Sequence, residues 1–189
     1  MLNFLKKNYG NILFAALIVL LVVPQTRMSI QIFLQRMFSA SPKEIAESER
    51  KTITNYYWQL LSVDNKSENF SNSKDKVIIL NFWATWCPPC VAELPSLQKL
   101  YDKFGDRVSF YFVSNEDASI LKNFLIKRGY NLPVYIEQTQ APEVLQSTAL
   151  PTTFVISHTG KIVMRKTGAA KWNSSSVHSL LSELLAAQK

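Results

Sequence analysis

The sequence contains little cysteine and little glycine. Two cysteines among 189 residues are too few for a small fold held together by disulfides, and too few for a zinc site built from cysteines. Five glycines and eight prolines exclude collagen-like and low-complexity chains. With 47% hydrophobic residues, the chain has enough apolar side chains for a buried core, so it is not a disordered protein.

Long runs of one charge are also absent. The net charge is +7, but Lys and Arg are spread along the whole chain and never more than two stand together. This pattern indicates a solvated, mildly basic surface. We therefore predict no nucleic-acid partner.

One apolar run lies close to the N-terminus. Residues 12–23 follow Lys6 and Lys7, and Pro24 ends the run. As a helix this run extends about 18 Å, which is typical of a signal peptide and less than the roughly 30 Å of a bilayer core. The lysines can reach the headgroups and lengthen the span, and no small-x-small cleavage site follows directly. We expect residues 1–24 to form an uncleaved signal anchor, with a removed signal peptide as the alternative.

The expected topology is a single pass through the cell membrane, with lipid contacts along residues 9–24. The basic residues before the run favour a cytoplasmic N-terminus, although Arg27 and Arg36 follow the run and weaken the asymmetry. The C-terminal domain is then expected on the periplasmic or extracytoplasmic side.

Residues 25–51 are predicted to form an amphipathic segment and a linker. Residues 39–51 are mostly polar and typical of a linker. Before them, five apolar side chains recur at helical spacing on one face: Ile30, Phe33, Leu34, Met37 and Phe38. Such a helix can lie in a membrane interface or pack against its own domain, and the sequence leaves both possibilities open.

Residues 52–189 are predicted to form one α/β domain. Strand-like and helix-like segments alternate, which indicates a sheet covered on both faces. Residues 77–82 and 108–113 are near-continuous apolar runs, typical of buried parallel strands. Turn-forming residues at 64–66 and 158–161 predict two β-hairpins. Apolar residues at helical spacing predict helices around 90–104, 120–125 and 177–185.

The candidate chemistry lies in the sequence Cys87-Pro88-Pro89-Cys90. The two cysteines stand between a predicted buried strand and a predicted helix, and their spacing lets the sulfurs close a small disulfide ring. A sulfur at a helix start is stabilised as thiolate by the free N–H groups of the first turn. We therefore expect Cys87 to be the exposed nucleophile and Cys90 the resolving thiol. Because neither proline has an N–H, the stabilisation should be moderate, which favours a reductant over a strong oxidant.

Other interpretations of the pair are weaker. Zinc needs about four ligands, and only His158 and His178 remain as further candidates, both distant in the sequence. A purely structural disulfide in so small a loop would constrain the unfolded chain little. A thiol-based chaperone that holds a metal or a haem protein without turnover remains the alternative function. We predict no metal and no other cofactor.

The residues around the pair resemble a known family. The sequence NFWATWCPPC at 81–90, followed by Glu93, Pro95 and LPTT at 150–153, is similar to thioredoxin-fold proteins. The similarity is greatest to the membrane-anchored bacterial TlpA/ResA-like thiol-disulfide oxidoreductases, and it covers residues 52–189.

The resemblance implies a thioredoxin-like fold, with a central mixed sheet flanked by helices and an N-terminal transmembrane helix in front. It also implies an extra N-terminal β-hairpin and an inserted segment before a cis-proline, and residues 115–146 fit that insertion. The implied activity is disulfide reduction or exchange in exported proteins, with a membrane redox protein as electron donor. Cytochrome c maturation is common among such relatives, and nothing in the sequence selects it over general protein repair.

The resemblance also assigns roles to residues. Glu93 matches a helix carboxylate near the dithiol, expected to raise the cysteine pKa values and to relay protons. Asn81 stands where cytosolic thioredoxins carry a buried aspartate, and an asparagine cannot accept a proton, so Glu93 is the remaining candidate. The expected docking surface for a substrate polypeptide consists of Trp86, Pro88, Leu150 and the cis-proline Pro151.

Overall fold

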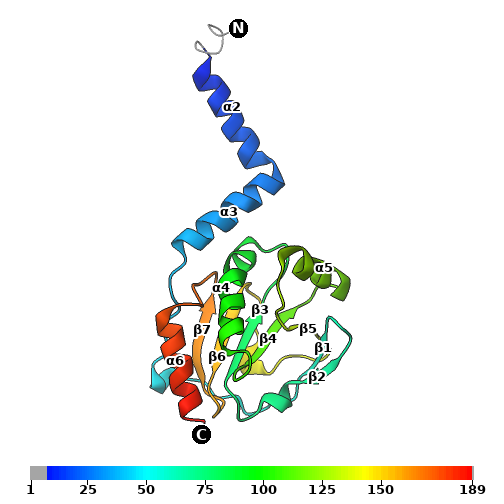
Figure 1. Ribbon diagram of the computed structural model, residues 1–189, viewed down its shortest axis with the longest axis vertical. Helices are drawn as coiled ribbons and strands as arrows, with labels where there is room; N and C mark the ends of the chain where they lie inside the picture. The colour runs from blue at the N-terminus through cyan, green and yellow to red at the C-terminus, as the bar shows by residue number, and fades with distance from the viewer. Residues whose placement is uncertain (1–7, 189) are drawn as a thin grey trace.

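Two helices precede the domain in the computed structural model, which describes residues 8–188 apart from the side chains at 15–17, 19–22, 24 and 25 (Figure 1). Helix α2 spans Tyr9–Val22 and helix α3 spans Pro24–Phe38. Val23 has an extended backbone between the two helices. Pro24 begins α3, and its missing N–H costs no hydrogen bond because the first N–H groups of a helix have no partner within it.

The predicted membrane-spanning helix is not confirmed. Lys6 and Lys7, on which the expected topology depends, lie outside the described residues. In the part of the chain that the structure describes, no helix has both the length and the apolar character needed to cross a bilayer.

The domain is built on a seven-stranded mixed sheet with the order β2-β1-β5-β4-β3-β6-β7. Strands β3, β4 and β5 are parallel to one another, whereas β1, β2, β6 and β7 pair with their neighbours in antiparallel fashion. The strands are β1 Gln59–Ser62, β2 Ser67–Asn69, β3 Ile78–Phe82, β4 Ser109–Ser114, β5 Val134–Glu137, β6 Thr152–Ile156 and β7 Ile162–Thr167.

Both predicted hairpins are present. Strands β1 and β2 form the first, and Asn65 turns it with a left-handed backbone at φ 60°, which asparagine tolerates better than most residues. Strands β6 and β7 form the second. The first hairpin lies at the edge of the sheet, beside β5.

The sheet is covered on both faces, but by different structures. On one face the core includes Leu94, Leu121 and Leu181, contributed by three helices. On the other face, described residues such as Trp58 and Phe70 come from extended segments and short 3-10 turns. The three helices are α4 Pro88–Phe104, α5 Ala118–Arg128 and α6 Ser175–Ala186, and the turns are η1 Glu47–Glu49, η2 Phe70–Ser73 and η3 Glu143–Leu145.

Residues 115–146, which fit the expected insertion, contain α5, β5 and η3. Gly129 ends α5 in a left-handed conformation at φ 68°, which glycine adopts without a steric penalty. Strand β5 then enters the sheet between β4 and β1. Residues 115–146 therefore widen the sheet, and their strand β5 pairs with β1 of the N-terminal hairpin.

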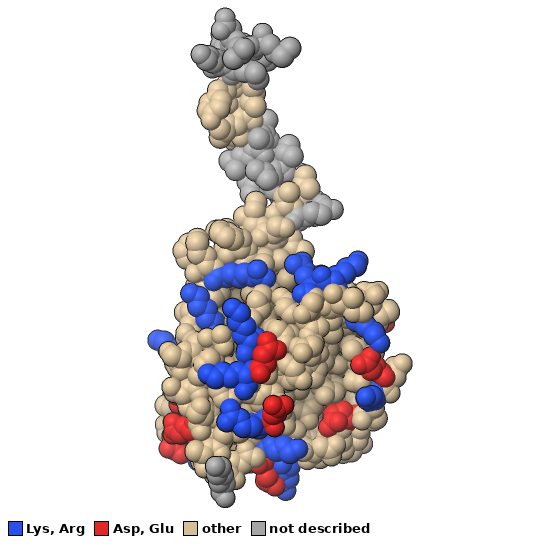
Figure 2. All heavy atoms as spheres, viewed as in Figure 1, with Lys and Arg blue, Asp and Glu red and all other residues tan. Residues whose placement is uncertain are grey.

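The charged side chains are mixed over most of the visible surface, as the scattered sequence pattern predicts. Figure 2 shows Lys and Arg alternating with Asp and Glu on the body of the domain. At the end of the domain next to α3, Lys and Arg predominate.

Candidate active site

The two cysteines lie where β3 passes into α4. Cys87 is the N-cap residue of α4, and it forms a disulfide with Cys90 at the end of the first turn. The Sγ of Cys87 also accepts a hydrogen bond from the backbone N–H of Cys90, with the two atoms 3.3 Å apart. Pro88 and Pro89 occupy the first two helical positions, which need no N–H. One backbone donor of the first turn is therefore directed at the sulfur of Cys87.

The expectation that Cys87 is exposed is wrong for this disulfide form. Only 4% of Cys87 is accessible to solvent, and Cys90 is fully buried. The first cysteine belongs to the core on the helical face of the sheet, together with Trp83 and Ala84. Helix α3 also packs on α4, and its Arg36 side chain reaches the carbonyl oxygens of the second turn. The packing of Cys87 into this core explains its low exposure.

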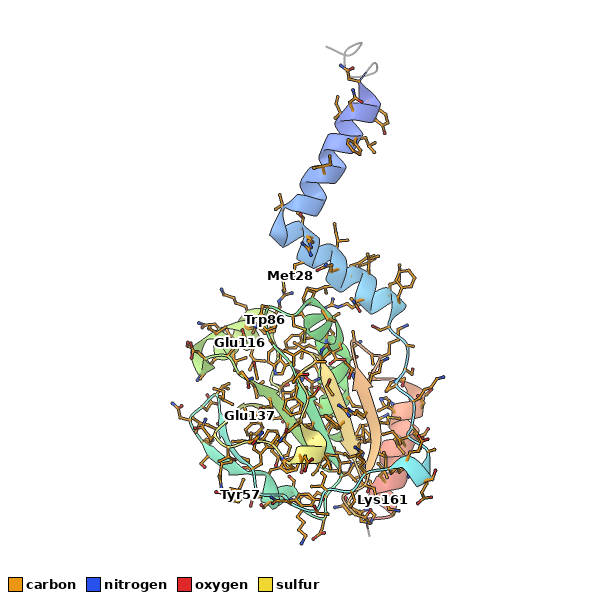
Figure 3. The ribbon with its side chains drawn as sticks, turned by 180° about the vertical axis from the view of Figure 1, so that it is seen from behind. Met28, Tyr57, Trp86, Glu116, Glu137 and Lys161 are labelled. Atoms are coloured by element: carbon orange, nitrogen blue, oxygen red, sulfur yellow. A yellow bond between two sulfur atoms is a disulfide. The ribbon has the colours of Figure 1, made fainter. Side chains whose placement is uncertain are left out.

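The loop before Cys87 carries two tryptophans in opposite environments. Trp83 is buried, as expected, whereas Trp86 is 66% exposed. The carboxylate of Glu116 holds the loop, because it accepts hydrogen bonds from the backbone N–H and the hydroxyl of Thr85, at 2.6 and 2.5 Å. Trp86 and Glu116 lie at the same end of the domain (Figure 3).

Sequence reasoning missed Glu116. Glu116 lies two residues after the end of β4, Thr85 lies three residues after the end of β3, and the two strands are parallel neighbours. Since parallel strands end at the same edge of a sheet, polar residues after β4 were the available signal for a partner of the active-site loop.

The cis-proline loop approaches the same place. The Leu150–Pro151 peptide bond is cis, as the resemblance implies, and Pro151 is buried. Thr152, the next residue, pairs with Phe82 at the end of β3, which brings the proline beside the active-site loop. A cavity of about 170 Å³ lies between the two loops, and its lining includes Trp86, Glu116, Glu137 and Leu150.

Glu93 is buried on α4, one turn beyond Cys90, with 2% of its surface exposed. Burial raises its pKa from 4.5 to about 7, although hydrogen bonds from its neighbours oppose the shift. The indole N–H of Trp172 lies 2.9 Å from one carboxylate oxygen, and the backbone N–H of Ala170 lies 3.2 Å from the same atom. The carboxylate is therefore buried among donors and has no cationic partner among them.

Asn81 on β3 completes this buried network. Its side-chain nitrogen donates to Glu93 at 2.8 Å and to the hydroxyl of Thr153 at 2.7 Å. Its side-chain oxygen has no hydrogen-bond partner among the described residues. Asn81 stands where, by the resemblance, cytosolic thioredoxins carry an aspartate. Its side chain is therefore hydrogen-bonded directly to Glu93.

The two histidines lie in other parts of the domain. His158 belongs to the turn between β6 and β7, and His178 on α6 contacts Lys103 and Asn173. Among residues 8–188, no three His, Cys, Asp or Glu side chains converge in a way that would hold a metal ion.

The chain is similar in sequence to proteins described as thiol-disulfide oxidoreductases. The thiol-disulfide oxidoreductase ResA of Bacillus subtilis (strain 168) is 35% identical over 112 residues, covering 58% of this chain and 63% of the relative. The match thus spans less than two thirds of that relative's length.

Solved structures match a larger part of the chain. The structure of a DsbF homologue from Corynebacterium diphtheriae has a TM-score of 0.60 and 20% identity, covering 75% of this chain and 93% of the other. The exposed lipoprotein thioredoxin Etrx1 from Streptococcus pneumoniae strain TIGR4 has a TM-score of 0.51 and 27% identity, covering 67% of this chain and 96% of the other. The mixed sheet with its flanking helices is therefore a thioredoxin-like fold. The family described as Redoxin matches residues 46–182, and the chain belongs to this family.

Proposed function

We propose that the protein is a thiol-disulfide oxidoreductase that reduces disulfides in other proteins. The observation that carries this proposal is the disulfide between Cys87 and Cys90, which lies at the start of α4 beside the cis-proline loop. The similarity to the thiol-disulfide oxidoreductase ResA supports it.

The proposed reaction has two exchange steps. In the reduced protein, the Cys87 thiolate attacks a substrate disulfide, forms a mixed disulfide and expels one substrate thiolate. The Cys90 thiolate then attacks the Sγ of Cys87, which restores the bond between the two cysteines and releases the second substrate thiolate. Two electrons pass to the substrate, and the protons of the two cysteines end on its thiols or in water. The single N–H donor directed at Cys87 supports moderate stabilisation of its thiolate, as suits a reductant.

We assign Glu93 to proton transfer with Cys90. The carboxylate follows Cys90 by one helical turn, and a pKa of about 7 lets it hold or release a proton near neutral pH. Cys90 must lose a proton before it can attack, and Asn81 at the neighbouring strand position cannot accept one. Glu93 is the buried carboxylate on the same face of α4.

The docking surface follows from the two loops. Trp86 is exposed beside Cys87, and Pro88 begins the helix on which the disulfide lies. The cavity between Trp86 and Leu150 has room for a side chain of the bound polypeptide. We propose that the backbone before the cis-proline Pro151 pairs with an extended segment of that polypeptide.

We further propose that the domain acts outside the cytoplasm, on exported proteins, and that a membrane redox protein reduces it. The N-terminal sequence supports a membrane location, because α2 contains no charged residue. An oxidised cysteine pair is also stable in such a compartment.

The test is capture of the substrate. The full chain with Cys90→Ala should form a lasting mixed disulfide through Cys87, and the chain with both cysteines replaced should form none. With dithiothreitol supplied as the electron donor that re-reduces the Cys87–Cys90 disulfide, the unmodified chain should also reduce the disulfides of a model protein over many turnovers, faster than dithiothreitol alone. Binding of Cu⁺ or Zn²⁺ by the reduced chain, without such turnover, would instead favour the chaperone function.

A further inference from the structure

Helix α3 contacts the active-site end of the domain through the side that carries Arg36. Arg36 donates to the carbonyl oxygens of Ala92 and Val91, at 3.3 and 3.5 Å. Immediately after the helix, the carbonyl oxygen of Ala40 accepts a hydrogen bond from the backbone N–H of Lys171. A groove of about 460 Å³ separates α3 from the first turn of α4, and Pro88 and Pro89 form its floor. The helix is therefore a fixed neighbour of the disulfide.

The other side of α3 is apolar and uncovered. Phe33 is 64% exposed, and Ile30 and Met37 are exposed on the same face at helical spacing. Leu34 and Phe38, at the rim of the groove, are exposed as well. A set of five large apolar side chains on one helix is larger than the scattered apolar residues of an ordinary surface, and it marks a binding surface.

The neighbouring elements indicate what this face contacts. Helix α2 leads directly into α3, contains no charged residue, and exposes Ile12, Leu13, Phe14 and Ile18. Residues 1–43 carry five basic residues and no acidic one, since Glu44 is the first carboxylate of the chain. Arg36, Lys99 and Lys171 line a cavity of about 280 Å³ where α3 meets the domain. Figure 2 shows that Lys and Arg predominate at the end of the domain next to α3.

We propose that the outward face of α3 lies on the surface of an anionic lipid bilayer and thereby holds the disulfide end of the domain next to the membrane. Amphipathic helices with apolar side chains on one face and basic residues beside it bind such surfaces. In this arrangement, α3 rests between the bilayer and the first turn of α4. Substrates whose disulfide lies close to the membrane surface are then favoured over those that lie far from it.

The proposal is tested with the full chain in lipid vesicles, using tryptophan emission and its quenching by brominated lipids. Phe33→Trp places a reporter on the outward face, and Ile126→Trp is the matched control at an apolar position on α5 that is 70% exposed. With anionic vesicles, the Phe33→Trp reporter should be quenched at least about threefold more than the control. Adding Ile30→Glu and Met37→Glu to the Phe33→Trp chain should remove this excess, while α2 keeps the chain on the vesicles.

Equal quenching of the two reporters would overturn the proposal. A change of Phe33→Trp emission that depends on protein concentration and not on lipid would also overturn it, because the face would then bind a second copy of the chain. The orientation is tested separately with lipids that carry a nitroxide on the headgroup. Trp86, the one exposed tryptophan of the four, should be quenched, and a Trp86→Phe chain identifies its signal. Absence of that quenching would contradict the placement of the active-site end. None of these readouts needs thiol chemistry, so they can succeed or fail independently of the proposed activity.

Discussion

Helices α4 and α6 begin with the same capping geometry and with different atoms. In α6, the hydroxyl of Ser174 accepts a hydrogen bond from the N–H of Val177, three residues later, at 3.4 Å. In α4, the sulfur of Cys87 accepts from the N–H of Cys90, also three residues later, at 3.3 Å. A hydroxyl in this position only caps the N-terminus of the helix. A sulfur accepts the same hydrogen bond and can also act as a nucleophile.

The two helices diverge further at the positions that follow. The first two residues of α4 are Pro88 and Pro89, where α6 has Ser175 and Ser176, each with a backbone N–H group. Six residues after the cap, α4 buries Glu93 and α6 buries Leu180. Relative to α6, helix α4 therefore carries three chemical changes on an ordinary helix start: a sulfur cap, fewer donors, and a carboxylate in the core.

The largest expected effect comes from giving α4 the oxygen cap of α6. Cys87→Ser keeps a capping atom, so the helix should persist, but disulfide reduction should fall by about 10³-fold or more because the hydroxyl is a much weaker nucleophile at neutral pH. Cys90→Ser is the matched control, since it removes the same disulfide. It should still form a mixed disulfide with a substrate in a single-turnover assay, followed by gel analysis. If both variants attack the substrate equally, Cys87 is not the nucleophile.

The next effect concerns the buried carboxylate and the pH dependence of stability. Because burial raises the pKa of Glu93 from 4.5 to about 7, the native state holds a proton that the unfolded state loses first. Unfolding free energy should therefore fall as the pH rises from 4.5 through 7, by about 3 kcal/mol in total. Glu93→Gln should remove this slope, as measured by urea unfolding at several pH values in the reduced and oxidised proteins.

Leu180→Ala supplies the control for Glu93→Gln on the other helix. It should lower stability by about 3 kcal/mol at every pH, because it leaves a cavity without a titrating group. Glutamine can be accommodated at position 93 because the unpartnered oxygen of Asn81 can accept its N–H after a turn of the Asn81 amide. A slope that survives Glu93→Gln would show that another group titrates.

The sequence predicted the local features of this site and missed the distant ones. The helix start at Pro88 and the turn at Asn65 follow from a few adjacent residues, whereas the cis bond at Pro151 follows from the resemblance to a known family, and each is present in the structure. The burial of Cys87 depends on how the core packs, and the contact of α3 with α4 joins Arg36 to Ala92, 56 residues later in the chain. No local pattern reports such a contact.

The surroundings of Glu93 show the same limit. Its position was predicted from a motif, but Trp172 donates to it across 79 residues of sequence and Ala170 across 77. The hydrogen bond from Thr85 to Glu116 joins residues 31 positions apart in the sequence. These contacts are fixed by the order of the strands, which hydrophobic patterns along a single chain do not specify.

A smaller effect is expected from restoring a donor to the first turn of α4. Pro89→Ser gives this position the N–H that Ser176 has in α6, and the added donor should lower the pKa of the Cys87 thiol. A stabilised thiolate favours the reduced form, so the reduction potential should rise by up to about 30 mV, a tenfold change in the exchange equilibrium. Equilibration with glutathione measures the shift. A lower potential would contradict the idea that the prolines limit stabilisation of the thiolate.

The smallest effect should come from the cap of α6. Ser174→Ala leaves the N–H of Val177 without its partner and should cost about 1 kcal/mol of unfolding free energy, as for other N-cap serines. Disulfide reduction and the reduction potential should not change, because α6 contributes no atom to the disulfide. Thermal unfolding and the glutathione equilibrium measure the two quantities on the same sample. A change in the reduction potential would mean that the starts of α4 and α6 are coupled through the core they share, so that the two helices act on the disulfide as one unit.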